Sequence, residues 1–456
     1  MVNEQVGYFE ANYVNFLSEL LDFLRIQSVS TDPERKQDVR QAADFLANKL
    51  VSIGIEHVEI FPTKRHPIVY GDYLHAGLAQ PTILVYGHYD VQPEDPINLW
   101  NTKPFEPEII GDNLYARGAS DMKGQVYACL AAIQSFLKVS DLPINVKFIF
   151  EGEEEIGSPN LVDFLIAHTG LLKSDCALNP DAGMTGKDKP TITYGLRGLS
   201  YFELRIFGPD RDLHSGSYGG IVHNPAQVLA ELISKMHDSE GRVTLPGFYD
   251  LVLPLTAQER DSIGRYSISD YDYCKSIGVP SLWGEKSFTA TERIGARPTL
   301  EINGILSGFV GQGSKTIIPS KAMAKISTRL VPDQKPELVY GQLLEFIRSN
   351  IPSTVRFELE QLSTGSPSIS DITIPETKAM AEALKFVWGV EPIYKREGGS
   401  VPVVADMQEI LGIDSVLTGF GLPDDRVHSP NEKLDLPTWR RGTIALIHFI
   451  ENLKRS

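Results

Sequence analysis

The first half of the chain alternates short apolar runs with segments of helical spacing. Residues 82–86 (TILVY) are apolar and end at Gly87, and residues 144–150 (INVKFIF) form a second apolar run that ends in glutamates. Between the two runs, apolar residues recur at helical spacing over residues 122–137. A strand, a helix and a second strand in this order predict an α/β fold with a mostly parallel, doubly wound sheet.

The middle of the chain has a different pattern. Residues 201–206 (YFELRI) alternate like a strand with one face in solvent, and apolar spacing predicts a helix at about 225–236. Further strands are predicted around Ile305 and at 322–330, after a region rich in proline and glycine. This block is therefore predicted to be an α+β domain.

Regular patterns resume after about residue 370. Three elements are predicted there: a helix at 376–387, a buried strand at 414–418 and a closing helix at 437–453. We predict a catalytic domain formed by residues 1–195 and 373–456, with an inserted domain at 196–372. Three sequential domains are the alternative, but the residues suited to chemistry fall in the first and last blocks.

The charge balance bears on the class of partner. The chain has 43 Lys and Arg against 59 Asp and Glu, which gives a formal charge of −16. Binding to nucleic acid or to an anionic membrane needs an excess of basic residues, so neither partner is expected. No Gly-x-Gly-x-x-Gly or Walker motif occurs, so nucleotide chemistry has no support.

Cysteine usage and the N-terminal segment bear on the compartment. Cys129, Cys176 and Cys274 are far apart, which fits neither a disulfide framework nor a Cys-x-x-Cys metal site. Residues 1–24 mix acids with apolar residues and are predicted to form an amphipathic helix rather than a signal peptide. No apolar stretch approaches the roughly 18 residues that span a bilayer. A cytoplasmic location is expected.

Acids and an imidazole follow the two predicted strands of the first block. His88 and Asp90 come directly after the first strand, and the run Glu151-Gly152-Glu153-Glu154-Glu155 follows the second. Taken alone, the histidine pair is typical of a surface or capping position, and the glutamates are typical of a solvated face. Parallel strands end at the same edge of a sheet, where ligand sites form. Like charges gathered at that edge need a cation to neutralise them.

Three further residues extend this candidate site. Asp121 precedes the predicted helix and could simply be its N-cap, Asp181 could be a turn residue, and His428 could be an incidental loop histidine. Together with the residues above they suit two divalent cations that share one carboxylate. A further glutamate could then act as a general base on a water molecule.

Six motifs occur in order along the chain. They are GHYDVQP at 87–93, ARGASDMKG at 116–124, FEGEEEIGS at 150–158, DLHSGSYGG at 212–220, EGGSVPVV at 397–404 and VHSPNE at 427–432. Together they resemble the family of dinuclear zinc peptidases and deacylases that includes cytosolic non-specific dipeptidase, carnosinase, aminoacylase and succinyl-diaminopimelate desuccinylase. The resemblance covers nearly the whole chain.

The resemblance implies a role for each matching position in the catalytic block. By this resemblance the metal ligands are His88 and Asp181 for one zinc, Glu155 and His428 for the other, and Asp121 as the bridge. Glu154 resembles the general base, and Asp90 resembles the carboxylate that orients His88. Mn²⁺ or Co²⁺ could substitute for the two Zn²⁺, because carboxylate and imidazole suit several divalent ions.

The resemblance also implies that the inserted block is a lid and dimerisation domain of a homodimer. In the dipeptidase branch a histidine of the His-Ser-Gly motif, here His214, reaches a neighbouring subunit's active site and stabilises the oxyanion. Thr316, Arg329 and Ser400 resemble substrate-binding residues, with Arg329 and Ser400 suited to a substrate carboxylate. Without the resemblance, each would be an ordinary loop, strand or turn residue.

The branch resembled most is that of the dipeptidases and carnosinases. The long 245–305 segment, RPTLEING at 297–304 and the form EGGSVPVV favour it, although residues 361–372 lack a histidine that some members carry near the substrate. We expect hydrolysis of dipeptides or very short peptides. An N-acyl-amino-acid amidohydrolase or carboxypeptidase with the same metal centre is one alternative. A catalytically silent binding or scaffold protein is another.

Overall fold

The structure is a computed structural model that describes residues 2–455. The chain forms two compact units: unit 1 comprises Met1–Tyr194, Ser370–Lys395 and Asp406–Ser456, and unit 2 comprises Gly195–Ile369 and Arg396–Ala405. The sequence pattern placed residues 396–405 in the catalytic domain, whereas the structure places them in unit 2. The reason is that this segment contains Ser400, which is hydrogen-bonded to Arg197 and Arg329 of unit 2.

Unit 1 contains a mixed sheet, and its α/β class is the predicted one. The strands run in the order β1-β2-β6-β3-β7-β17-β8. Pairing is parallel among the central strands β6, β3, β7 and β17, and antiparallel for β1, β2 and β8. Their bounds are β1 Glu56–Phe61, β2 Ile68–Tyr73, β3 Thr82–His88, β6 Asn145–Glu151, β7 Cys176–Asn179, β8 Thr191–Leu196 and β17 Ser415–Thr418.

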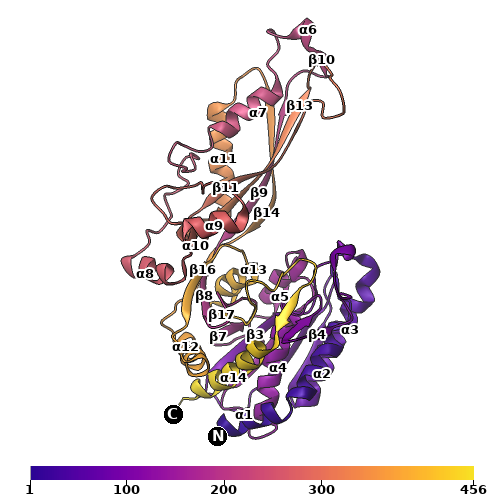
Figure 1. The fold of residues 1–456 in the computed structure, drawn as a ribbon, viewed down its shortest axis with the longest axis vertical. Helices are drawn as coiled ribbons and strands as arrows, with labels where there is room; N and C mark the ends of the chain where they lie inside the picture. Colours follow the sequence, from indigo (N-terminus) through magenta and orange to yellow (C-terminus); the bar gives the residue numbers. More distant parts are fainter. Residues whose placement is uncertain (1, 456) are drawn as a thin grey trace. The chain divides into compact units, whose positions relative to one another are not determined.

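Helices cover this sheet, and two of them pack together on one face (Figure 1). These are α4 (Lys123–Leu137), which is the predicted crossover helix, and α14 (Leu436–Asn452), which closes the chain. Trp439 is fully buried and donates from its indole nitrogen to the carbonyl of Gly124 at 2.8 Å. The remaining longer helices of unit 1 are α1 Val2–Ala11, α2 Tyr13–Leu24, α3 Lys36–Ile53, α5 Leu161–Ala167 and α12 Pro375–Trp388.

The N-terminal segment forms two helices, where the apolar pattern predicted one. The break lies at Asn12, whose side-chain amide donates to the carbonyl of Tyr8 at 2.9 Å. Asparagine side chains compete with the backbone for such hydrogen bonds, which is why they interrupt helices. Both helices bury an apolar stripe, including Phe9 and Phe16, in the core of unit 1.

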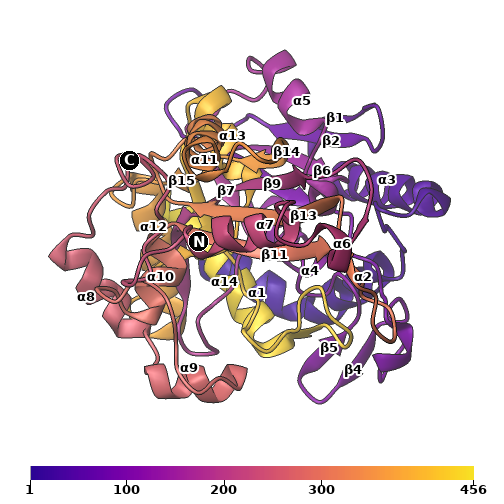
Figure 2. The ribbon, with the colours of Figure 1, turned by 90° about the horizontal axis from the view of Figure 1, so that it is seen from above.

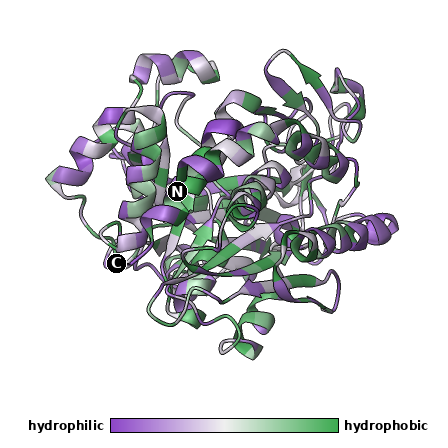
Figure 3. Cartoon of the chain, turned by 90° about the horizontal axis from the view of Figure 1, so that it is seen from below, coloured by the Kyte–Doolittle hydropathy of each residue, from purple (hydrophilic) through white to green (hydrophobic). Residues whose placement is uncertain are grey.

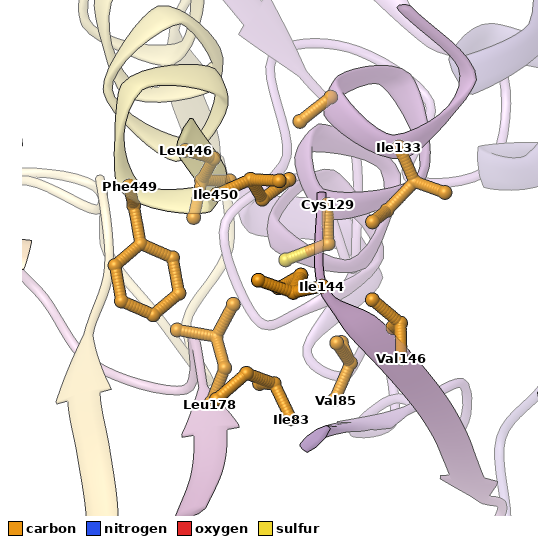
Figure 4. A pocket seen from close by; sticks show the side chains of 11 residues that line it. Ile83, Val85, Cys129, Ile133, Ile144, Val146, Leu178, Leu446, Phe449 and Ile450 are labelled. Atoms are coloured by element: carbon orange, nitrogen blue, oxygen red, sulfur yellow. The ribbon is translucent and has the colours of Figure 1, made fainter. Parts of the chain in front are cut away.

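A small apolar cavity remains between the sheet and the helices α4 and α14 (Figure 4). Its lining consists of aliphatic and aromatic side chains, with Cys129 as the one sulfur atom. Burial raises the pKa of the Cys129 thiol to about 12, so this thiol stays protonated. Figure 3 shows hydrophobic residues concentrated on the inner strands and hydrophilic residues on outward helix surfaces, as a buried sheet requires.

Unit 2 is built on an antiparallel sheet with the order β11-β13-β9-β14. The helices α7 (Pro225–Ser234) and α11 (Pro336–Asn350) pack on one face of it (Figures 1 and 2). The strands are β9 Gly198–Phe207, β11 Thr299–Ser307, β13 Lys321–Leu330 and β14 Arg356–Gly365. A separate ribbon pairs β10 (Leu213–His214) with β12 (Ile317–Ile318). The elements match the α+β pattern predicted for this block.

Shorter elements complete the chain. They are β4 Glu108–Ile110, β5 Asn113–Tyr115, α6 Ser215–Tyr218, α8 Ala257–Tyr266, α9 Asp270–Ile277, α10 Ala290–Ala296, β15 Ser368–Ile369, β16 Ile393–Glu397, α13 Pro402–Asp406 and β18 Lys433–Asp435. Within residues 2–455, no helix has both the length and the apolar character that crossing a membrane demands.

Candidate active site

His88 is the last residue of β3 and is fully buried. Its Nδ1 lies 3.0 Å from the backbone oxygen of Asp90 and 3.5 Å from the Asp90 carboxylate. On the other side of the ring, Nε2 lies 3.1 Å from Asp121 and 4.0 Å from Asp181. An Nδ1–H that donates toward Asp90 leaves the Nε2 lone pair directed at the two carboxylates, which is how a metal-binding histidine is oriented.

Asp121 is shared by two groups of candidate ligands. Its Oδ1 faces His88, and its Oδ2 lies 2.9 Å from Nε2 of His428. The same nitrogen of His428 lies 3.2 Å from Glu155. The two groups are therefore His88, Asp121 and Asp181, and Asp121, Glu155 and His428, each with its ligand atoms within 4.8 Å of one another. One carboxylate that faces both groups suits a bridge between two cations.

Burial and charge shift the pKa values of this site. Hydrogen bonds to Asp121 and then to Glu155 raise the pKa of His428 to about 10. Burial, reinforced by the charge of Asp121, raises the pKa of the Asp181 carboxyl well above its usual range. Burial raises the pKa of Glu154 as well. Burial and neighbouring negative charge thus disfavour ionisation of Asp181 and Glu154 until a cation neutralises them, which favours cation binding at this site.

The three consecutive glutamates have different surroundings. Glu153 is buried, and its carboxylate accepts hydrogen bonds from the backbone of His66 and the side chain of Asn160, both at 2.7 Å. Glu155 faces His428. The carboxylate of Glu154, by contrast, accepts no hydrogen bond from any residue within 2–455. Among the three, Glu154 is the one free to exchange a proton.

The Asp90 carboxylate holds this glutamate segment in place. Its two oxygens accept hydrogen bonds from the backbone N–H of Glu154 at 3.3 Å and of Glu155 at 3.1 Å. Asp90 therefore orients His88 on one side and the glutamates on the other. The sequence pattern anticipates only the first of these contacts.

Sequence reasoning missed three residues that support the site. Gln92 donates to Glu155 at 2.8 Å, and Glu432 accepts from the backbone N–H of Asp121 at 3.0 Å. Arg117 in turn donates to Glu432 at 2.7 Å. All three lie inside motifs that resemble the family, and that position is the only signal the sequence offers for them.

In unit 2, Arg329 and Ser400 meet. Nη1 of Arg329 donates to the Ser400 hydroxyl at 2.8 Å, and that hydroxyl donates to the backbone oxygen of Arg197 at 2.5 Å. Burial, and then the charge of Arg329, lower the pKa of Arg197 to about 10. Neither guanidinium forms an ion pair with a carboxylate among residues 2–455. Two adjacent cations without a carboxylate partner suit an anionic ligand.

His214 and Thr316 lie together elsewhere in unit 2. His214 ends β10 and pairs with Ile317 of β12, and Thr316 directly precedes β12; the backbone N–H of Ser215 donates to the Thr316 oxygen at 3.0 Å. Nδ1 of the exposed His214 ring accepts from the backbone N–H of Gly216 at 2.9 Å, so Nε2 carries the proton and can donate. At ~3.3 Å per residue, β13 separates this ribbon from Arg329 by roughly 25 Å. The structure does not bring the two pairs together within unit 2.

Comparisons with known proteins identify the family. The sequence profile of Peptidase family M20/M25/M40 matches residues 84–452. The Cys-Gly metallodipeptidase DUG1 of Candida albicans is 34% identical over 94% of this chain and 93% of its own length. The Beta-Ala-His dipeptidase of Homo sapiens is 32% identical over 97% of this chain and 90% of its own.

A solved structure agrees with these sequence matches. The M20 family metallo-carboxypeptidase Sso-CP2 from Sulfolobus solfataricus has a TM-score of 0.86 at 35% identity, and the match covers 96% of this chain and 99% of that one. The family resemblance that the six motifs predicted is thereby confirmed. The chain belongs to peptidase family M20/M25/M40.

Proposed function

We propose that the protein is a metal-dependent dipeptidase. The observation that carries the proposal is that Asp121 faces two ligand groups at once, next to a glutamate with a free carboxylate. The donors fit the metals: each group combines imidazole with carboxylate, as Zn²⁺ sites do, and Mn²⁺ or Co²⁺ could substitute. When bound, two such cations would polarise the scissile carbonyl and acidify a water molecule.

The protein's own residues handle the proton. Glu154 takes a proton from the attacking water and delivers it to the leaving amine. Glu154 belongs to neither ligand group, so its carboxylate is free to take up the proton and to release it again. Asp90 fixes the positions of His88 and Glu154 relative to each other through the hydrogen bonds described above.

We propose that Arg329 and Ser400 bind the free carboxylate of the substrate. Replacing Arg329 by methionine removes a charge-assisted hydrogen bond of ~1.5–3 kcal/mol, which corresponds to a loss in kcat/KM of roughly 10–150-fold. The loss is expected mainly in KM, and dipeptide amides, which lack the carboxylate, should not be affected. Steady-state kinetics on a dipeptide and its amide measure both. An equal loss on the two substrates would contradict the assignment.

We propose that the protein is a homodimer in which His214 acts on the partner's substrate. The support is that His214 and Thr316 are too far from Arg329 to bind the same dipeptide within unit 2. As a donor to the oxyanion, His214 is worth about 10²–10³-fold in kcat, and His214→Ala should lose that factor. Mixing His214→Ala and Glu154→Gln chains should then restore part of the activity. In a mixed dimer, the active site of the His214→Ala chain keeps its own Glu154 and receives an intact His214 from the partner chain. No recovery in an exchanged dimer would contradict the proposal.

A carboxypeptidase is the second candidate function. It is favoured by the similarity to Sso-CP2, a metallo-carboxypeptidase of the same family. Both activities need a site for a free carboxylate, so substrate length separates them. Parallel assays of dipeptides, tripeptides and N-acetyl amino acids decide the matter: cleavage confined to dipeptides supports the dipeptidase, and efficient cleavage of longer peptides supports the carboxypeptidase. Preferred cleavage of N-acetyl amino acids would contradict both.

We also propose a cytoplasmic location. The support is that Cys129, Cys176 and Cys274 are all free thiols, as is usual in a reducing compartment. Fractionation of cells that produce the protein tests this, and recovery in a secreted fraction would contradict it.

A further inference from the structure

Glu432 is a buried carboxylate outside the candidate ligand groups. It lies four residues after His428 and is fully inaccessible to solvent. Its Oε1 accepts hydrogen bonds from the backbone N–H groups of Ser120 at 2.9 Å and Asp121 at 3.0 Å. Its Oε2 accepts from the backbone N–H of Gly118 at 3.1 Å and from Arg117 at 2.7 Å. Every one of these donors belongs to the loop that carries the shared aspartate.

The loop that holds Glu432 is itself firmly anchored. Arg426, His428 and Asn431 all adopt left-handed backbone angles, a conformation that asparagine accepts readily but that other non-glycine residues adopt only infrequently. The Asn431 side chain accepts from the backbone N–H of Asn101 at 2.6 Å and donates to the carbonyl of Leu99 at 2.9 Å. Glu432 therefore acts from a rigid segment.

We propose that Glu432 is a positioning residue that fixes Asp121 relative to His428. The inference rests on the proposed function, since it assumes that both residues hold metal. Glu432 accepts a hydrogen bond from the backbone of Asp121 and lies four residues after His428 in the same loop. It therefore links the aspartate shared by both ligand groups to the histidine of one of them. Groups that hold a ligand in place commonly account for 10–100-fold in metal affinity.

The negative charge of Glu432 is also required, because it neutralises a buried guanidinium. Arg117 is buried, and its guanidinium forms an ion pair with Glu432. Glu432→Gln would keep the shape of the side chain but replace one oxygen by an NH₂ group, which cannot accept hydrogen bonds. The side chain would then lose its hydrogen bonds either from Arg117 and Gly118 or from Ser120 and Asp121.

Asp425 offers a matched control. It is equally buried, lies in the same C-terminal loop, and accepts from Ser120 Oγ, the Leu422 backbone and Lys433 at 2.8–3.0 Å. It does not touch the backbone of Asp121. Asp425→Asn thus removes one buried negative charge from the same region without releasing the shared aspartate.

The test is a titration of metal-free protein with Zn²⁺ against a competing chelator, with circular dichroism to establish that each variant is folded. Glu432→Gln should weaken binding of both metals by about 10–100-fold, and Asp425→Asn by less than about tenfold. Co²⁺ absorption spectra should change for Glu432→Gln and stay as in the parent chain for Asp425→Asn.

Equal affinities for the parent and Glu432→Gln, or equal losses in the two variants, would overturn the positioning role. If Glu432→Gln does not fold, Glu432→Asp serves instead: it keeps the charge but is too short to reach both pairs of donors, and parental affinity would overturn the inference. Failure of the parent chain to bind metal would instead overturn the proposed function, so the two failures are distinguishable.

Discussion

Glu154→Gln is expected to lower kcat for dipeptide hydrolysis by about 10²–10⁴-fold, the usual contribution of a positioned general base. Glutamine has nearly the same shape but cannot take up a proton at neutral pH. KM should change little, because Glu154 is expected to act on the water and not to bind the substrate. Metal content should stay at the parental level, since Glu154 belongs to neither ligand group.

The neighbouring Glu153→Gln is the matched control for this prediction. Its carboxylate is occupied by hydrogen bonds to His66 and Asn160, so the change should reduce the free energy of unfolding more than it reduces turnover. Kinetics and thermal unfolding of both variants separate the roles. A Glu154→Gln chain with near-parental kcat, or a Glu153→Gln chain that is folded but inactive, would show that the base is assigned to the wrong glutamate.

Asp121→Asn is expected to remove both metals and with them nearly all activity. The reason is that its two oxygens face different ligand groups, so one substitution damages both. A neutral amide is a poorer ligand than a carboxylate and leaves more positive charge in the site uncompensated. The loss of affinity should exceed the roughly 10–100-fold that is typical of a supporting residue.

Asp181→Asn is the comparison, because Asp181 belongs to one group only. It should weaken one metal strongly and the other little. Titration of each metal-free variant with Zn²⁺ measures both affinities. If Asp121→Asn lost one metal and kept the second at parental affinity, Asp121 would not be a shared ligand.

Local pattern predicted the elements that position the site. The apolar runs at 82–86 and 144–150 are β3 and β6, and their carboxyl ends place His88 and the glutamate run at one edge of a parallel sheet. This prediction works because strand length and parallel pairing follow from burial of both faces, which is visible as continuous apolar sequence.

Other features depend on contacts that no local pattern encodes. Glu432 is a charged residue near the end of a loop, and only folding brings it against a backbone more than 300 residues earlier. The break at Asn12 depends on one side-chain hydrogen bond, and residues 396–405 join unit 2 through Ser400. In each case a specific side-chain hydrogen bond determines the structure, and the pattern of apolar residues does not reveal it.

Metal binding by the metal-free parent chain is the measurement closest to the central idea that residues from both ends of the polypeptide enclose a pair of cations. We expect two Zn²⁺ per chain, with dipeptide hydrolysis absent before the titration and restored as the second ion binds. A chain that binds none or one, or that hydrolyses dipeptides equally well in excess chelator, would contradict the account.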